Sequence, residues 1–222
     1  MFVLGLTGSI GMGKTETANV FRRLGVPVYD ADAAVHRLLG PGGGAVAAVE
    51  AAFPGVVRDG RVDRPALGAR VFNDKPALKR LEAIVHPLVA GEQRRFLACA
   101  ARRRARLVVL DVPLLFETDG EARTDAIAVV SAPRRVQRQR VLARPAMTEA
   151  KLDGILAQQL SDSLKRRRAD YVIPTGLGKR QALNRVQRIV TMLKGRSGHR
   201  WPPRARPRPR SARHPSRRAI HA

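Results

Sequence analysis

The feature that most constrains this chain is a glycine-rich segment near its amino end, G-S-I-G-M-G-K-T at residues 8–15. It matches the pattern G-x-x-x-x-G-K-[ST] without a gap. The apolar run Phe2–Leu6 precedes it, and the segment Thr15–Leu24, with apolar residues at helical spacing, follows it. A strand that enters such a loop and leaves it as a helix aims successive backbone N–H groups and the positive helix end at one anion. The segment therefore predicts a phosphate-binding loop.

The motif assigns roles to the residues of the loop. We expect these residues to bind the phosphates of ATP: Gly8, Gly11, Met12, Gly13, Lys14, Thr15 and Glu16. Lys14 is expected to reach the β- and γ-phosphates, and the Thr15 hydroxyl to ligate Mg²⁺, so Mg²⁺ with ATP as co-substrate is predicted. Glu16 stands where a second hydroxyl residue often occurs, so its backbone N–H is the expected contact. A solvated acid that favours the helix dipole is the alternative for Glu16, and a chance glycine-rich turn is the alternative for the whole motif.

Downstream of the loop, short apolar runs alternate with helical patterns. Strands are expected at residues 27–29, 106–112, 125–131 and 171–173, and helices up to residue 39 and at 179–194. Between residues 45 and 104 only helical patterns are evident, at 45–53, 64–72 and 75–84. Strands that alternate with helices indicate a parallel sheet covered on both faces. We expect a core of residues 1–40 and 105–194, a helical insertion at about 41–104, and a lid at about 133–160.

The chain is strongly basic, with 42 Lys and Arg against 18 Asp and Glu and a formal charge of +24. This excess favours anionic ligands. Residues 195–222 contain nine Arg and no acid, and they are so poor in apolar residues that we expect a disordered tail. Nonspecific contact of this tail with nucleic acid is the alternative function that the charge suggests, as an accessory property at most.

Several function classes are disfavoured by composition. The single cysteine, Cys99, excludes an internal disulfide framework and a cysteine zinc cluster. No apolar run reaches the length of a membrane span, so a cytoplasmic protein without a membrane partner is expected. The guanine-reading pattern N-K-x-D is absent. A kinase of small metabolites remains, in which an acid near the second strand handles the acceptor and an arginine lid closes on the phosphates.

Six segments then narrow the class. They are G-L-T-G-S-I-G-M-G-K-T, V-Y-D-A-D at 28–32, I-V-H-P-L-V at 84–89, V-L-D-V-P-L-L-F-E at 109–117, V-V-S-A-P at 129–133 and R-R-A-D-Y-V-I at 167–173. Occurring in this order, they closely resemble the dephospho-CoA kinase family, over about residues 1–194. The resemblance implies a P-loop NTPase fold, a three-layer α/β/α core with a helical CoA-binding insertion and a helical lid. It also implies that ATP and dephospho-CoA are the substrates, that phosphate is transferred to the 3′-hydroxyl of the ribose, and that this is the last step of CoA biosynthesis. A nucleoside monophosphate kinase and a shikimate-type kinase are the alternatives.

Two carboxylates are carried over from the family pattern. Asp32 matches the acid of D-A-D and is expected to be the general base for the ribose hydroxyl. The alternative is that Asp32 or Asp30 caps the following helix. Asp111 ends an apolar strand, where it is expected to hold Mg²⁺ through water, or alternatively to hydrogen-bond the phosphate loop.

The acceptor contacts are also matched to the family. Residues expected to bind the acceptor are Arg64, His86, Pro113, Leu114 and Leu115, with Glu117 a weaker candidate. For each of these residues a structural role is the alternative: a solvated arginine, a structural histidine, or leucines of the core. His86 precedes Pro87, which predicts an extended kink or a helix start at this point.

The lid is expected to contribute arginines from R-R-V-Q-R-Q-R-V-L-A-R-P, in which Arg138, Arg140 and Arg144 occur. Arg140 and Arg144 are four residues apart, so on a helix they share one face. Like charges placed in this way favour an intervening anion, so we expect both to bind ATP and Arg140 to be catalytic. A basic solvated helix is the alternative.

The sequence departs from the family at two positions. Gly154 stands where the family usually has an arginine shortly before the Gln158 position. Thr175 follows A-D-Y-V-I where the family often has an asparagine, so we expect backbone groups rather than this side chain to hold the adenine.

Overall fold

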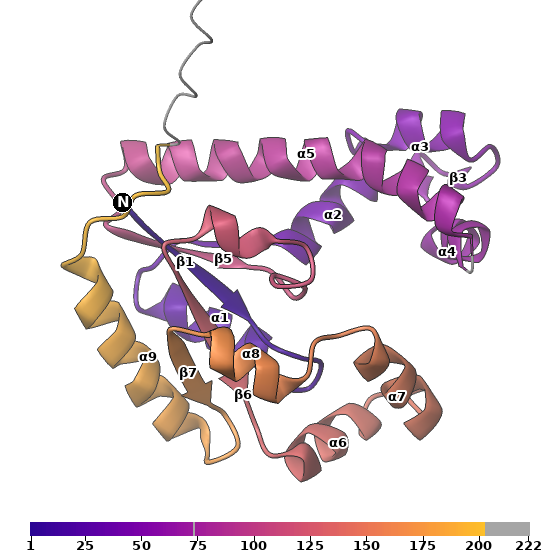
Figure 1. Ribbon diagram of the computed structural model, residues 1–222. Helices are drawn as coiled ribbons and strands as arrows, with labels where there is room; N and C mark the ends of the chain where they lie inside the picture. Colours follow the sequence, from indigo (N-terminus) through magenta and orange to yellow (C-terminus); the bar gives the residue numbers. More distant parts are fainter. Residues whose placement is uncertain (73, 203–222) are drawn as a thin grey trace, which may run out of the picture.

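The structure, a computed structural model, describes residues 1–72 and 74–202. Its core is a parallel sheet of five strands in the order β2-β5-β1-β6-β7 (Figure 1). The strands are β1 Phe2–Thr7, β2 Val28–Asp30, β5 Leu107–Asp111, β6 Ala126–Ser131 and β7 Tyr171–Pro174. Parallel neighbours need crossover connections, which place helices on both faces of the sheet. The predicted three-layer α/β/α fold is confirmed.

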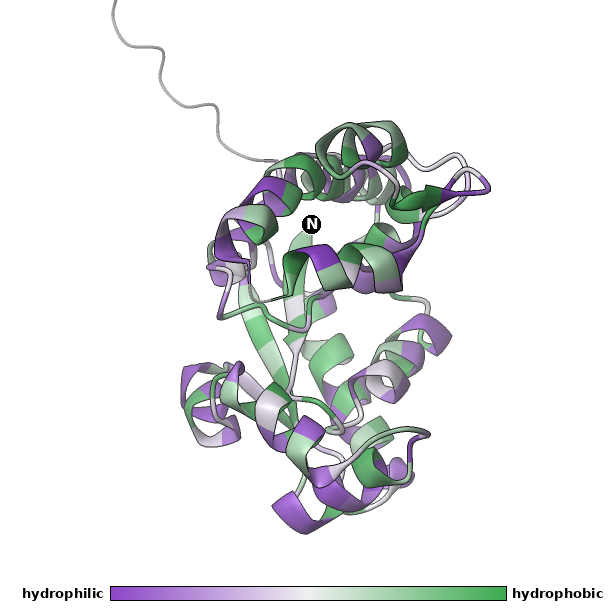
Figure 2. Ribbon diagram, turned by 90° about the vertical axis from the view of Figure 1, so that its right-hand side faces the viewer, coloured by the Kyte–Doolittle hydropathy of each residue, from purple (hydrophilic) through white to green (hydrophobic). Residues whose placement is uncertain are grey.

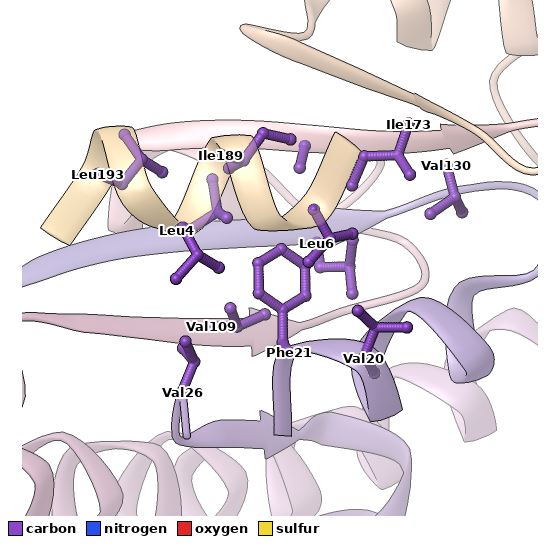
Figure 3. Close-up of a cluster of buried hydrophobic side chains, with 14 of the residues drawn as sticks. Leu4, Leu6, Val20, Phe21, Val26, Val109, Val130, Ile173, Ile189 and Leu193 are labelled. Carbon is purple, nitrogen blue, oxygen red and sulfur yellow. The ribbon is translucent and has the colours of Figure 1, made fainter. Parts of the chain in front are cut away.

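The apolar runs of the sequence are strands that are covered on both faces. All six residues of the central strand β1 are buried. Its alternate residues Leu4 and Leu6 pack with α1 (Lys14–Arg23) and α9 (Lys179–Lys194) on one side of the sheet (Figure 3). Val3 points to the opposite side, where it packs in a cluster with residues of α5 (Lys75–Arg102). Two covered faces leave no position for a polar residue, which explains the continuous apolar pattern.

Helix α2 Ala31–Leu39 follows β2 and falls within the expected core of residues 1–40. The segment expected to form the insertion, about residues 41–104, then contains α3 Val46–Ala52, α4 Arg64–Val71 and α5. It also contains a small antiparallel hairpin, β3 Val57–Arg58 and β4 Arg61–Val62, which the sequence analysis did not predict. The turn is Asp59-Gly60, and both residues have positive φ, 49° and 70°. Asp-Gly is a strong signal for a two-residue hairpin turn, so the sequence did contain this element.

Helix α5 corrects the expectation for Pro87. The sequence predicted an extended kink or a helix start there, but α5 runs through Pro87 as one helix of 28 residues. A proline inside a helix costs about 3 kcal/mol. Burial on both sides of the proline offsets this cost: Val85 packs in the core of the insertion, and Leu97 packs on the sheet. The carboxyl-terminal half of α5 therefore belongs to the core layer, and its other half to the insertion.

The lid region follows β6 and lies beyond the carboxyl ends of the strands. It contains α6 Arg134–Leu142 and α7 Glu149–Ala157, and α8 Asp162–Arg168 then leads back to the sheet. Figure 2 looks at this edge of the sheet, with the insertion above it and the lid helices below it. The phosphate loop and the ends of β2 and β5 lie between these two bodies, as the proposed roles require.

The first eight residues of the predicted disordered tail, 195–202, are described by the structure and make defined contacts. Residues 195–202 are described, and the side chain of Asp125 accepts hydrogen bonds from the N–H groups of His199 (2.6 Å) and Arg200 (3.0 Å). Trp201 packs against the cluster around Leu97. Disorder was therefore the wrong expectation for residues 195–202, while the rest of the predicted tail, 203–222, lies outside the described residues. Within the described residues, no helix has both the length and the apolar character needed to cross a membrane.

Candidate active site

The phosphate loop, residues 8–15, connects β1 to α1 and has the conformation that its glycines predict. Gly11 and Gly13 have φ values of 75° and 87°, in the left-handed region. Gly13 is the N-cap of α1, and no side chain caps this helix. The N–H groups of the first turn, which include those of Lys14, Thr15 and Glu16, therefore have no partner within the helix. Free donors of this kind at the positive end of a helix are suited to bind an anion.

Neighbouring elements press closely on the loop glycines. A Cβ atom on Gly11 would lie 2.4 Å from Cγ2 of Val141 in α6. On Gly8 it would lie 2.3 Å from Cγ2 of Val130 at the end of β6. Distances this short are steric clashes, so both positions need glycine for space as well as for backbone freedom. The lid helix α6 is consequently packed directly on the phosphate loop.

Lys14 makes an ion pair with Asp111, whose carboxylate lies at the end of β5. The Nζ–Oδ1 distance is 2.6 Å, and the Asp111 side chain is 3% exposed. Burial raises the pKa of Asp111, the charge and hydrogen bond of Lys14 lower it, and the nearby Asp30 and Asp32 raise it further, so that the net shift is upward. The structure thus shows the alternative role of Asp111, a hydrogen bond to the phosphate loop. It also gathers three acids at the carboxyl ends of β2 and β5.

The two acids at the junction of β2 and α2, Asp30 and Asp32, have different roles in the structure. Asp30 is the N-cap of α2, and its Oδ1 accepts a hydrogen bond from the N–H of Ala33 at 2.9 Å. The helix-capping role that the sequence left open therefore belongs to Asp30. Asp32 lies in the first turn of α2, is exposed, and makes no side-chain hydrogen bond or ion pair within the described residues. Its carboxylate is thus available to an acceptor.

Asp32 lines a large cleft of about 1520 Å³. One wall is formed by α2 and α5, and the other by the segment of residues 112–125 that follows β5. His86, Pro113 and Leu114, three of the residues expected to bind the acceptor, also line this cleft. Arg64 does not line it and is an exposed residue at the start of α4.

Leu115 and Glu117, two other candidates from the D-V-P-L-L-F-E segment, do not line the cleft. Leu115 is 1% exposed and packs with Phe116, Ile127 and Val129, so it has the core role that the sequence left as the alternative. Glu117 pairs with the fully buried Lys165 of α8 at 2.9 Å. Its Oε1 also accepts a hydrogen bond from the N–H of Leu160 at 2.9 Å.

The lid is tied to the phosphate loop by side chains that the sequence analysis did not identify. Gln137 of α6 donates its Nε2–H to the carbonyl of Ile10 at 2.8 Å, and Gln159 accepts from the N–H of Ile10 at 3.2 Å. Thr175 donates its hydroxyl to the carbonyl of Met12 at 2.6 Å. Polar residues of this kind resemble surface residues in a sequence, and only the buried position of Gln137 and Thr175 reveals their function.

Arg140 is held at the same junction. Its Nη2 donates to the carbonyl of Thr175 at 2.7 Å, and its Nη1 donates to the Thr175 hydroxyl at 3.2 Å. The guanidinium therefore lies beside the loop, since the same hydroxyl contacts the carbonyl of Met12. Thr175, at the second departure from the family pattern, thus links Arg140 of the lid to Met12 of the loop.

The other lid arginines differ from the expectation. Helix α6 ends at Leu142, so Arg144 lies beyond it, exposed, and does not share a helical face with Arg140. The helix stops because Pro145 follows, and the residue before a proline disfavours the helical region. Arg138 pairs with Glu149 and, at 3.9 Å, with Asp153 of α7. It thus links the two lid helices.

Gly154 lies in α7, where a Cβ atom would meet nothing within 4 Å. An arginine of the family pattern would fit at this position without a steric clash. Gln158, which matches the glutamine of the family pattern, is exposed, whereas the adjacent Gln159 accepts a hydrogen bond from the loop.

A phosphate loop on this sheet, with a lysine that reaches an acid on the neighbouring strand and a cleft for an acceptor beside it, defines a phosphotransferase of the P-loop α/β class. Comparison with known proteins agrees. The family model described as dephospho-CoA kinase matches residues 2–178. The chain belongs to the dephospho-CoA kinase family.

Individual relatives support this assignment. The dephospho-CoA kinase of Paramagnetospirillum magneticum is 67% identical over 195 residues, which are 88% of this chain and 92% of the relative. That of Mesorhizobium japonicum is 57% identical over 198 residues, which are 89% of this chain and all of the relative. Among solved structures, TT1252 of Thermus thermophilus superposes with a TM-score of 0.76 at 35% identity, covering 86% of this chain and 96% of the other. The dephospho-CoA kinase of Campylobacter jejuni shares the fold, with a TM-score of 0.60 at 20% identity over 86% of this chain and 96% of the other.

Proposed function

We propose that this chain transfers the γ-phosphoryl group of ATP to the 3′-hydroxyl of the ribose of dephospho-CoA, the last step of CoA biosynthesis. The observation that carries the proposal is that the phosphate loop and the large cleft meet at one group of acids. Asp111 contacts Lys14 of the loop, and Asp32 lines the cleft. Asp32 is also close enough to Asp111 to influence its pKa. A phosphoryl group bound by the loop would thus lie next to an acceptor bound in the cleft.

In this proposal the loop binds ATP through its backbone. The curled residues from Gly8 to Gly13 and the free N–H groups at the start of α1, including that of Glu16, hold the phosphates. Lys14 exchanges part of its contact with Asp111 for the β- and γ-phosphates, where its charge offsets theirs. Arg140 stabilises the negative charge of the transferring group from its position beside the loop, and Arg144 reaches the phosphates from beyond the end of α6.

Asp32 is the general base. It accepts the proton of the ribose hydroxyl as the phosphoryl group arrives, and it is free to do so because Asp30 takes the capping role. His86, Pro113 and Leu114 contact the acceptor from the walls of the cleft. Arg64 is proposed to reach the acceptor from the insertion, although it does not line the cleft.

Magnesium fits the donor set at the loop. Mg²⁺ prefers oxygen ligands and usually binds proteins through one or two of them together with substrate phosphates and water. The exposed hydroxyl of Thr15 would be a direct ligand, and Asp111 would hold the ion through water. When bound, the ion neutralises charge on the phosphates.

Turnover of ATP with dephospho-CoA, AMP, CMP and shikimate in parallel tests the proposal. We expect dephospho-CoA alone to accelerate ADP formation strongly. Asp32→Asn should lower kcat about 10²–10⁴-fold with little change in ATP affinity, because it removes only proton transfer. Asp59→Asn, in the hairpin turn of the insertion, is the matched control. Lack of acceleration by dephospho-CoA would overturn the substrate, and normal turnover of Asp32→Asn would overturn the base.

A cytoplasmic location is part of the proposal, and the single cysteine is its support, because chains stabilised by disulfides are typical of oxidising compartments.

A further inference from the structure

The acceptor cleft extends far beyond the acids, to the opposite edge of the sheet. Its lining residues on α5 run from Leu81 to Leu97, which corresponds to about 24 Å at 1.5 Å per residue. Leu97 packs with Val108 near the start of β5, whereas Asp32 and Pro113 follow the carboxyl ends of β2 and β5. The cleft is thus long enough for an extended ligand that lies along the strands.

The far end of this cleft is closed by the segment that follows α9. His199, Arg200 and Trp201 all line the cleft. In Figure 1 the segment passes the amino terminus of the chain and the carboxyl-terminal end of α5. The family model ends at residue 178, so these three residues lie outside the part that defines the family.

Specific contacts hold the segment in place. The carboxylate of Asp125 accepts hydrogen bonds from three N–H groups, those of Val3 (2.8 Å), His199 (2.6 Å) and Arg200 (3.0 Å). Gly198 lies so close to the amino terminus that a Cβ atom there would be 2.3 Å from the carbonyl oxygen of Met1. The Nε–H of Arg200 donates to the carbonyl of Thr124 at 3.2 Å. The main chain immediately before Trp201 is therefore fixed by these contacts, and Trp201 itself packs against the cluster around Leu97.

The chemistry of the lining changes along the cleft. Asp32 lies at the reaction centre, whereas Arg94, Arg123 and Arg200, together with Asp125, line the part formed by α5, the segment before β6 and the segment after α9. None of these three arginines forms an ion pair within the described residues. Asp125 is near them, but its oxygens are already occupied by backbone N–H groups. This lining would suit a ligand in which an anionic group is followed by an apolar chain. The anionic group would contact the arginines, and the apolar chain would contact the indole of Trp201.

From these observations we propose that Trp201, with Arg200, binds the arm of the acceptor that extends from its ribose, and thereby sets specificity for the full-length acceptor over a bare nucleotide. The proposal rests on the proposed function, in which the acceptor is dephospho-CoA. With its ribose at Asp32, the diphosphate would lie among the arginines, and the pantetheine chain would reach the indole. AMP has the same adenosine but lacks the pantetheine chain, so it should not reach Trp201.

The chain contains one tryptophan and two tyrosines, so fluorescence excited selectively in tryptophan reports on this position alone. We expect dephospho-CoA to change the emission of the full-length protein saturably, whereas AMP and ATP, which carry the same adenine, leave it unchanged. This measurement needs no substitution and therefore no assumption about the folding of a variant. An emission that dephospho-CoA leaves unchanged while calorimetry shows that it binds would overturn the inference.

Calorimetry on variants provides the second test. Trp201→Ala should weaken the binding of dephospho-CoA roughly tenfold and leave the Kd of AMP and ATP unchanged, because only the arm loses a contact. Trp201→Phe should restore most of the affinity. Leu177→Ala, an exposed apolar residue outside the cleft, is the matched control. Equal affinity of wild type and Trp201→Ala for dephospho-CoA would overturn the inference alone, whereas a wild-type protein that binds ATP but no dephospho-CoA would overturn the proposed function.

Discussion

The ion pair between Glu117 and Lys165 allows a test of how much a buried charge pair stabilises this protein. Lys165 is completely buried, and its Nζ lies 2.9 Å from Oε1 of Glu117. Glu117→Gln keeps an acceptor for the N–H of Leu160 but leaves the ammonium group without a counter-charge. Loss of one partner of a buried pair costs about 3–5 kcal/mol. For a chain of 150–250 residues each kcal/mol lowers Tm by about 2–4 °C, so we expect a decrease of roughly 6–20 °C.

Thermal unfolding followed by circular dichroism measures this change. The double variant Glu117→Gln/Lys165→Met should recover most of the loss, because an apolar side chain of similar length removes the unpaired charge. The matched control is Glu121→Gln, which removes the surface pair of Glu121 with Arg168, both about 40% exposed, and should cost less than about 1 kcal/mol. A single variant Glu117→Gln within about 2 °C of wild type, a shift too small for the loss of a buried charge pair, would refute the argument. So would a double variant less stable than the single one.

The same pair predicts an acid dependence. Burial raises the pKa of Glu117, but the hydrogen bonds from Lys165 and from the N–H of Leu160 outweigh it, and the net pKa lies below the usual 4.5. A carboxyl whose pKa is lowered by folding stabilises the protein above its unfolded pKa and loses this contribution as the pH falls through the folded one. The Tm of the wild type should therefore fall more steeply below about pH 4.5 than that of the double variant. Parallel curves for the two proteins would contradict this assignment.

Three further predictions concern the loop, the lid and the tail. Gly11→Ala should lower the free energy of unfolding by at least about 1–2 kcal/mol because of its left-handed backbone, which denaturant unfolding measures. It should also weaken ATP binding by displacing Val141 of α6, and an ATP titration that shows unchanged affinity would contradict this second effect. Thr175→Val should destabilise the protein by about 1–3 kcal/mol and lower kcat, because the Met12 carbonyl and Arg140 lose a buried partner; a normal kcat would mean that Arg140 needs no anchor. Replacing the seven arginines at positions 204–218 by serine should abolish any salt-dependent retention of nucleic acid in a filter-binding assay and leave kinase turnover unchanged, whereas a loss of turnover would show that the tail is more than an accessory.

Most of the fold follows from local patterns in the sequence. The strands β1, β5 and β6 are fully buried, so each appears as an uninterrupted apolar run, and α9 shows apolar residues on one face over its whole length. Helix α5 could not be predicted in full, because its continuity past Pro87 depends on two cores that lie far apart in the sequence. The contacts of residues 195–202 were missed for the same reason. Their partner, Asp125, is more than 70 residues away in the chain.

Among the site residues, too, only those whose role is tied to a local sequence pattern could be predicted. Lys14 and Asp111 could be identified because their roles are tied to the phosphate motif and to a strand end. By contrast, nothing near Gln137 in the sequence distinguishes it from a solvated residue, and Thr175 stood out only as a departure from the family pattern, without the contacts that it makes. Arg144 was misplaced because four-residue spacing was taken to mean a shared helical face, although Pro145 ends the helix before that residue.

The contacts of Ile10 explain how the lid and the loop act together. Its carbonyl accepts a hydrogen bond from Gln137, which lies in the first lid helix, α6. Its N–H donates a hydrogen bond to Gln159, which follows the second lid helix, α7. The two ends of the lid are thus fastened to one residue of the phosphate loop, while α7 is linked to α6 by Arg138. A shift of the loop on binding phosphate must therefore move both ends of the lid or break two hydrogen bonds, each worth about 1 kcal/mol. Since Arg140 lies between these two ends in the chain, its approach to the phosphates is coupled to the conformation of the loop that binds them.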